Sequence, residues 1–192
     1  MLLGGGTDLR ALLAASIEET RQAHGGACDL GNPDSPSSTV SIVHVRGGVL
    51  DCLVLGDSPV VIGAPGEDLV VISDDRVAHL PGGRPYTLGL VRSARNQPGG
   101  FWVSSTAPEA AFQSVTGTVP FAAGSEAGVF TDGASRLVEF YGYSWDRLFS
   151  VLRAAGPTGL IALVRSMERD RPPDHGKQHD DATAVLMTGN RI

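Results

Sequence analysis

The sequence is short of cysteine and lysine and has no long hydrophobic run, and each shortage excludes a class of protein. Its only cysteines are Cys28 and Cys52. Two cysteines are too few for a disulfide framework or a multi-cysteine zinc site, and we expect both to be buried thiols in a reducing cytoplasm. Lysine occurs once, and no run of Lys and Arg is present in a chain with a formal net charge of −6. Nucleic acid is therefore not an expected ligand.

The first residues carry no targeting signal. Met1 to Leu3 are followed by three glycines, and no basic segment leads into a long apolar stretch. We therefore expect no signal peptide, no membrane span and a cytoplasmic location. A chain of 192 residues that is 42% hydrophobic can bury one core, so we expect a single domain over 1–192 with a flexible start at 1–6. Scarce lysine beside abundant glycine, alanine and arginine is typical of a high-GC genome.

Hydrophobic periodicity and helix or strand breakers predict a mixed fold. Thr7 or Asp8 can cap a helix in which apolar residues recur with a helical period, namely Leu9, Leu12, Leu13, Ile17 and, as an optional member, Ala23. The runs at 39–46 and 49–55 flank two glycines and predict a hairpin, which the runs at 60–62 and 69–72 extend into an antiparallel meander. Further helices are expected at 86–95 and 134–140, and another begins at Pro108 and stops at Gly117. Ser144 caps a helix that Pro157 separates from a last helix at 160–168. Two more strands are expected at 127–130 and 182–187. Strands in runs and helices in runs indicate an α+β fold in which helices cover antiparallel sheet.

Three acidic clusters stand beside predicted strands. Their aspartates are Asp57 in Gly-Asp-Ser, Asp132 in Thr-Asp-Gly and Asp180 in Asp-Asp-Ala-Thr. A carboxylate at a strand end has a fixed backbone and a side chain that reaches solvent, which suits a hard cation such as Mg²⁺ or Mn²⁺. These clusters are the part of the chain that indicates chemistry, and the chemistry they suit is hydrolysis of phosphate esters.

In this order and on these elements, the clusters resemble those of the metal-dependent protein phosphatases of the PPM type, also called protein phosphatase 2C. The resemblance extends over residues 8–187 and implies a sandwich of antiparallel sheets flanked by helices, α/β/β/α. It implies a bacterial Ser/Thr phosphatase that uses Mg²⁺ or Mn²⁺ to activate water and acts on a phosphoprotein substrate. Carried over to this sequence, Asp132 and Asp180 would be ligands of the metal pair, and Asp57 would belong to a further, weaker metal position.

The chain departs from the family pattern at three places. An earlier Asp-Gly motif, on strands that the family places before the first helix, has no counterpart here, so we expect an N-terminally truncated fold with an incomplete metal site. Arg136 stands where the family often has an acid, and a guanidinium there opposes an extra cation. Pro59 replaces the arginine that commonly follows Gly-Asp-Ser, and no arginine near the N-terminus matches the family's phosphate-binding one. Missing strands would expose apolar sheet edges, so we also expect self-association.

Simpler interpretations exist for each feature. Asp57 can serve a turn, Asp132 can cap the following helix, and Asp180 with Asp181 can be a solvated loop end. The whole chain can be a pseudophosphatase that acts as a binding or regulatory module, or the product of a gene whose start lies upstream. His175 and His179 have zinc-like spacing, although prolines favour a loop there. The aromatic residues between 140 and 149 are expected in the core, with a partner groove as the alternative.

Overall fold

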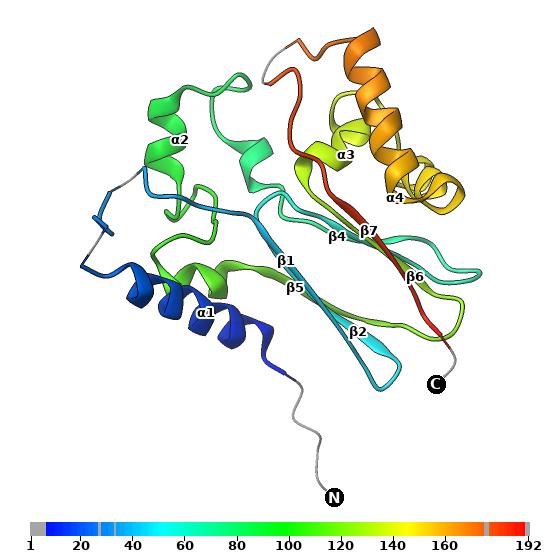
Figure 1. Cartoon of the computed structure of the whole chain (residues 1–192), viewed down its shortest axis with the longest axis horizontal. Coiled ribbons are helices and arrows are strands. Elements are labelled where there is room, and N and C mark those ends of the chain that lie inside the picture. The colour runs from blue at the N-terminus through cyan, green and yellow to red at the C-terminus, as the bar shows by residue number, and fades with distance from the viewer. Residues whose placement is uncertain (1–6, 27, 33, 175–176, 191–192) are drawn as a thin grey trace, which may run out of the picture.

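The computed structural model describes residues 7–26, 28–32, 34–174 and 177–190, so the expected flexible start at 1–6 lies outside the described residues. Two antiparallel sheets stack on each other, and helices cover the outer side of each sheet (Figure 1). This four-layer α+β arrangement confirms the expected fold class. The elements are α1 (Leu9–His24), β1 (Val40–Arg46), β2 (Val49–Leu55), β3 (Val60–Gly63), β4 (Val70–Ile72), α2 (Leu88–Ala94), β5 (Val115–Pro120), β6 (Glu126–Phe130), α3 (Asp132–Glu139), α4 (Trp145–Asp170) and β7 (Ala184–Thr188), with 3₁₀ turns at Arg76–His79 and Pro108–Gln113.

The first sheet has the order β1-β2-β5 and carries α1 on its outer face. Asp8 caps α1, because its carboxylate accepts hydrogen bonds from two backbone N–H groups of the first turn. Of the predicted helical stripe, Leu9, Leu13 and Ile17 are buried against Leu53 and Leu55 of β2. Leu12 and Ala23 were wrongly included, because both are exposed. The N-terminal helix and the following hairpin were therefore predicted correctly.

The second sheet has the order β4-β3-β6-β7 and is covered by α3 and α4. Its outer core contains the aromatic residues Tyr141 and Phe149, with Phe140, Tyr143 and Trp145 packed beside them, which confirms the core interpretation of the aromatic cluster. Between the sheets lies a further apolar layer to which β2 contributes every second residue, namely Leu50, Cys52 and Val54. Because β2 also sends Leu53 and Leu55 to the opposite face, it is buried on both sides.

Two expectations are wrong, one about the pairing of the first four strands and one about the element that contains Gly117. The four runs from 39 to 72 do not form one meander, because β1 and β2 pair in one sheet and β3 and β4 pair in the other. The chain crosses between sheets at Gly56–Pro59, where Gly56 has a φ of +82°. Gly117 does not stop a helix but lies within β5, where an added Cβ would be 2.5 Å from the Ile72 side chain of the other sheet. Glycine there permits close packing of the two sheets.

Helix α4 has the length and composition that could cross a membrane. It is interrupted at Gly156, whose φ is +69°, directly before Pro157, so the expected break between two helices is confirmed. Both halves send apolar side chains into the core, among them Leu152 and Leu160. A core helix of a sheet-containing domain accounts for this composition.

The two cysteines lie in different surroundings. Cys52 is buried between the sheets, and burial raises the pKa of its thiol to about 11, so the thiolate form is scarce at neutral pH. Cys28 is exposed. The expectation of two buried thiols is therefore wrong for Cys28, which lies in the loop after α1 rather than in a strand.

Candidate functional site

The three predicted aspartates come together at one end of the second sheet. Asp57 lies just before β3, Asp132 just after β6 and Asp180 just before β7. Strand β6 runs between β3 and β7 and is antiparallel to both. The start of β3, the end of β6 and the start of β7 therefore share one end of the sheet.

The electrostatics of these carboxyl groups show that they are close enough to interact. Burial, followed by the negative charge of Asp132, raises the pKa of Asp57 to about 6. Burial also raises the pKa of Asp132, and the charge of Asp180 adds to that rise. Asp132 is thus the central member, with Asp57 on one side and Asp180 on the other. Neighbouring carboxylates that raise one another's pKa are a frequent feature of functional sites.

A cavity of about 290 Å³ opens where Asp57 and Asp132 meet. Its wall includes the segment between β4 and α2 and the exposed side of α3, and one guanidinium, that of Arg84, lies among its charged groups. Asp74, on the same wall, is buried and accepts hydrogen bonds from the Gly56 N–H (2.9 Å) and from Arg76. This contact fixes the crossing segment that carries Asp57.

The Thr-Asp-Gly motif joins the start of α3 to the segment before β7. The Thr131 hydroxyl accepts a hydrogen bond from the Thr183 N–H at 3.0 Å. A Cβ on Gly133 would be 2.1 Å from the backbone oxygen of Asp181, so only glycine allows this approach. The interpretation of Asp132 as a helix cap is wrong, because Thr131 occupies the cap position and Asp132 is the first residue of α3.

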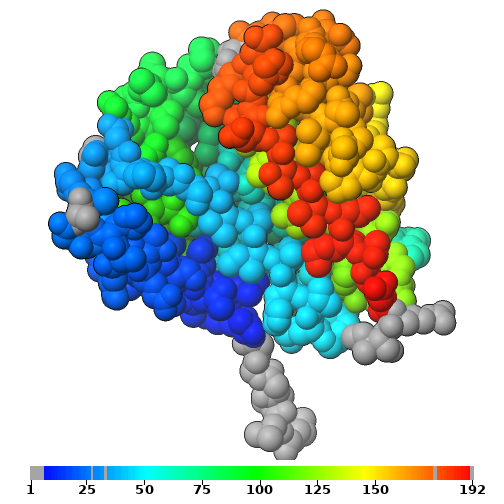
Figure 2. Space-filling model, in the orientation of Figure 1, coloured from blue at the N-terminus to red at the C-terminus, as the bar shows by residue number. Residues whose placement is uncertain are grey.

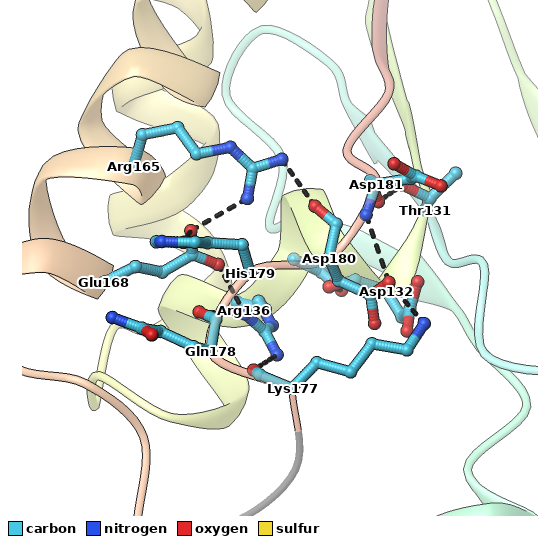
Figure 3. A network of polar contacts seen from close by, with 11 residues as sticks. Thr131, Asp132, Arg136, Arg165, Glu168, Lys177, Gln178, His179, Asp180 and Asp181 are labelled. Carbon is cyan, nitrogen blue, oxygen red and sulfur yellow. Dashed lines mark hydrogen bonds and ion pairs between the residues drawn. The ribbon is translucent and has the colours of Figure 1, made fainter.

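A buried carboxylate that was not predicted holds the segment with Asp180 in place (Figure 3). Glu168 of α4 is fully buried and accepts hydrogen bonds from Arg136, from Arg165 (2.8 Å) and from His179 (2.8 Å). Burial alone would raise the pKa of Glu168, but these hydrogen bonds lower it. Arg165 also donates to the backbone oxygen of Asp180. Glu168 therefore connects α3, α4 and the segment before β7.

Arg136 has a different role from the expected one. Its side chain is buried, and its guanidinium donates to Glu168 and to the backbone oxygens of Lys177 (2.6 Å) and Gln178 (3.2 Å). Most of its donors are thus used to anchor the chain, although its charge still lowers the pKa of Asp132. Sequence reasoning could have found Glu168, since it follows Leu160 and Val164 at intervals of four residues and so continues the buried stripe of α4.

The carboxylates fit one hydrated cation better than a pair of cations held by the protein alone. Among the described residues, no group of three or more His, Cys, Asp or Glu side chains converges as a metal site. The Asp180 carboxylate accepts from Lys177 at 2.8 Å and from the Asp181 N–H at 3.0 Å. Mg²⁺ commonly keeps several waters and uses one or two carboxylates together with substrate phosphate, and Asp132 with one neighbour meets that requirement. For the alternative zinc site, the two histidines were His175 and His179. His179 is hydrogen-bonded to Glu168, and His175 lies outside the described residues.

Solved structures of phosphatases share this fold. No family model and no curated protein matches the sequence. One similar structure is PppA, a key regulatory component of T6SS in Pseudomonas aeruginosa, with a TM-score of 0.57 and 20% sequence identity over 93% of this chain and 67% of that one. Another is serine-threonine phosphatase 2C from Toxoplasma gondii, with a TM-score of 0.62 and 14% identity over 93% of this chain and 66% of that one. A third is the serine/threonine phosphatase of S. agalactiae, with a TM-score of 0.58 and 17% identity over 97% of this chain and 73% of that one. The chain spans about two thirds of the length of the first two. It has the fold of the PPM-type, or protein phosphatase 2C, Ser/Thr phosphatases.

Proposed function

We propose that the chain is a PPM-type phosphatase domain that hydrolyses phosphoserine or phosphothreonine esters in proteins with the help of Mg²⁺ or Mn²⁺. Asp132 is the central ligand of the cation, with Asp180 and, more weakly, Asp57 beside it. The observation that carries this proposal is that Asp57, Asp132 and Asp180, which come from segments far apart in the sequence, lie at the same end of the neighbouring strands β3, β6 and β7. From composition and the resemblance alone, we also place the protein in a bacterial cytoplasm.

The chain's own residues hold these carboxylates where a cation would relieve their repulsion. Gly133 lets the segment with Asp180 approach Asp132, and Arg165 holds the Asp180 backbone. A divalent cation bound there would lower the pKa of a water ligand and neutralise phosphoryl oxygens. The cavity beside Asp57 and Asp132 provides room for the phosphate group.

Hydrolysis of p-nitrophenyl phosphate with Mn²⁺ tests this proposal. We expect activity above a metal-only blank, and we expect Asp132→Asn to abolish most of it because the central carboxylate is lost. Asp146→Asn is the matched control, since Asp146 also lies in the first turn of a helix but is exposed and outside the site. Activity of the unsubstituted chain no higher than the blank would refute the proposal for residues 1–192.

A second candidate function is a pseudophosphatase that acts as a binding or regulatory module. It is favoured by the lack of a three-ligand cluster within the described part of the chain and by the ion pair between Asp180 and Lys177. Isothermal titration with Mn²⁺ separates the two functions. A micromolar site supports the phosphatase, and absent or millimolar binding supports the module.

A further inference from the structure

The cavity beside Asp57 and Asp132 is strongly acidic. The charged groups of its wall are one guanidinium, that of Arg84, and five carboxyl groups, those of Asp57, Asp74, Asp75, Asp132 and Glu139. A phosphate monoester carries about −1.5 to −2 charges at neutral pH. Such a ligand would be repelled unless cations on the wall or in the cavity offset the carboxylates.

Arg84 is held at this wall by contacts that leave part of its guanidinium free. Its Nη1 forms an ion pair with Glu139 of α3, and the guanidinium lies 5.7 Å from the ring centre of Phe140 and 6.0 Å from that of Tyr86. The side chain is 29% exposed. A guanidinium has five N–H donors, and Glu139 is its one ion-pair partner among the described residues. The remaining donors are available to a ligand in the cavity.

The other cations near the aspartates do not line this cavity. Arg76 donates to Asp74 and to the backbone oxygen of Gln113. Arg136 is buried against Glu168 and two backbone oxygens. Lys177 pairs with the Asp180 carboxylate at 2.8 Å and, with Arg169, lines a separate groove of about 520 Å³ on the side of Asp180. Within the described part of the chain, Arg84 is therefore the cation that lines the cavity between Asp57 and Asp132.

We propose that Arg84 binds the phosphate group of the substrate in this cavity, and that Glu139 holds the guanidinium until phosphate replaces it. This inference rests on the proposed function. A planar guanidinium donates two parallel hydrogen bonds to a phosphate, which a lysine cannot do. The rings of Phe140 and Tyr86 flank the guanidinium of Arg84 and limit its movement. The loop between β4 and α2 thus supplies the phosphate-binding arginine of this cavity.

Binding of inorganic phosphate in the presence of Mg²⁺, followed by the ³¹P line width, tests this role without requiring turnover. We expect Arg84→Gln to weaken binding about tenfold or more, since a charge-assisted hydrogen bond contributes about 1.5–3 kcal/mol. Arg84→Lys should recover only part of the affinity. Arg169→Gln is the matched control, because Arg169 is an exposed arginine of the neighbouring groove, and it should bind phosphate as the unsubstituted chain does. Circular dichroism confirms that each variant is folded.

Glu139→Gln tests the exchange from the opposite direction. Removing the competing carboxylate should tighten phosphate binding several-fold. Asp75→Asn is its control, because Asp75 lines the same cavity but pairs with His79 rather than Arg84. The gain from Glu139→Gln should exceed the gain from Asp75→Asn, and equal gains would mean that only the general charge of the cavity matters, which overturns the exchange.

The outcomes separate this inference from the function on which it rests. Unchanged phosphate affinity in Arg84→Gln, or no phosphate binding by the unsubstituted chain, overturns the role of Arg84. Phosphate binding that depends on Arg84, in a chain that does not hydrolyse p-nitrophenyl phosphate, refutes catalysis and leaves the binding role standing. The pseudophosphatase would then be a phosphate-recognising module.

Discussion

Two glycines at equivalent helix positions should respond in opposite ways to the same substitution. Gly133 is the second residue of α3, and Gly89 is the second residue of α2. An alanine Cβ at position 133 would be 2.1 Å from the Asp181 backbone oxygen and 2.9 Å from its carbonyl carbon, whereas a Cβ at position 89 would have no heavy atom within 4 Å. Helix propensity acts on both positions, and the steric conflict acts only on Gly133.

The magnitudes decide the sign at each position. Replacing glycine by alanine within a helix stabilises by roughly 0.5–1 kcal/mol, and this is the whole effect expected for Gly89→Ala. At position 133 the obstructing atoms belong to the backbone and cannot rotate away, so the segment 180–182 must move by about 1 Å to restore contact. Overpacking of this kind costs about 1–3 kcal/mol. We therefore expect Gly133→Ala to be destabilising by about 1–2 kcal/mol.

Urea unfolding measures the difference. With a slope of about 3 kcal/mol/M, the midpoint of Gly133→Ala should fall by about 0.5 M, and that of Gly89→Ala should rise by about 0.2–0.3 M. Titration with Mn²⁺ should also show weaker binding for Gly133→Ala, because moving the segment 180–182 separates Asp180 from Asp132. An equal rise in both midpoints would refute the steric reasoning. Loss of stability with unchanged Mn²⁺ affinity would show that the segment yields without moving Asp180.

Three further predictions concern charge and sheet edges. Because the pKa of Asp57 is raised in the folded state, the stability contributed by its protonated form is lost as pH rises through about 6. Asp57→Asn should therefore raise the free energy of unfolding in urea by about 1–2 kcal/mol at pH 8 and leave it unchanged below about pH 4. The lowered pKa of Glu168 has the opposite sign, with stability present above its unfolded pKa and lost as pH falls through the folded value. Glu168→Gln should therefore be destabilising by about 3–5 kcal/mol at pH 7, and by less below about pH 4. Light scattering should show that the chain self-associates and that Val185→Lys reduces the association. Val185 is an exposed apolar residue on the edge strand β7, which lies uncovered beside α4 (red in Figure 2).

Elements with a local signal could be predicted from the sequence, and the pairing of strands could not. The stripe of Leu9, Leu13 and Ile17 identifies α1 because the 3.6-residue period and the cap at Asp8 are both local. The period of two along β2 predicts a strand but does not reveal which sheet its neighbours join. The crossing at Gly56–Pro59 has the same turn residues as a hairpin, so only packing distinguishes them. Strand β5 was missed because Gly117 resembles a helix stop, whereas its lack of a side chain serves contact with the other sheet.

The candidate site divides in the same way. Asp57, Asp132 and Asp180 could be predicted because each is an acidic residue beside an apolar strand. Glu168 has a local signal for burial, because it continues the buried stripe of α4. Its partners, and the role of Arg84, could not be predicted, since they depend on contacts between residues distant in the sequence, such as Arg136 and Glu168 at a separation of 32. The helical period can indicate that a charged residue is buried, but it does not reveal which residue binds it.

Arg136 shows why the sign of a charge near a site does not determine its effect. Considered alone, its guanidinium opposes a cation beside Asp132, and replacing it by a neutral residue would be expected to improve cation binding. Its contacts imply the reverse, because Arg136 is one of two arginines that neutralise the fully buried Glu168 and it holds the backbone at Lys177 and Gln178. Without it, Glu168 would keep one fewer cationic partner, and the segment with Asp180 would lose its attachment to α3. The small electrostatic gain at Asp132 is therefore outweighed by displacement of Asp180, and the acidic cluster depends on a positive charge for its geometry.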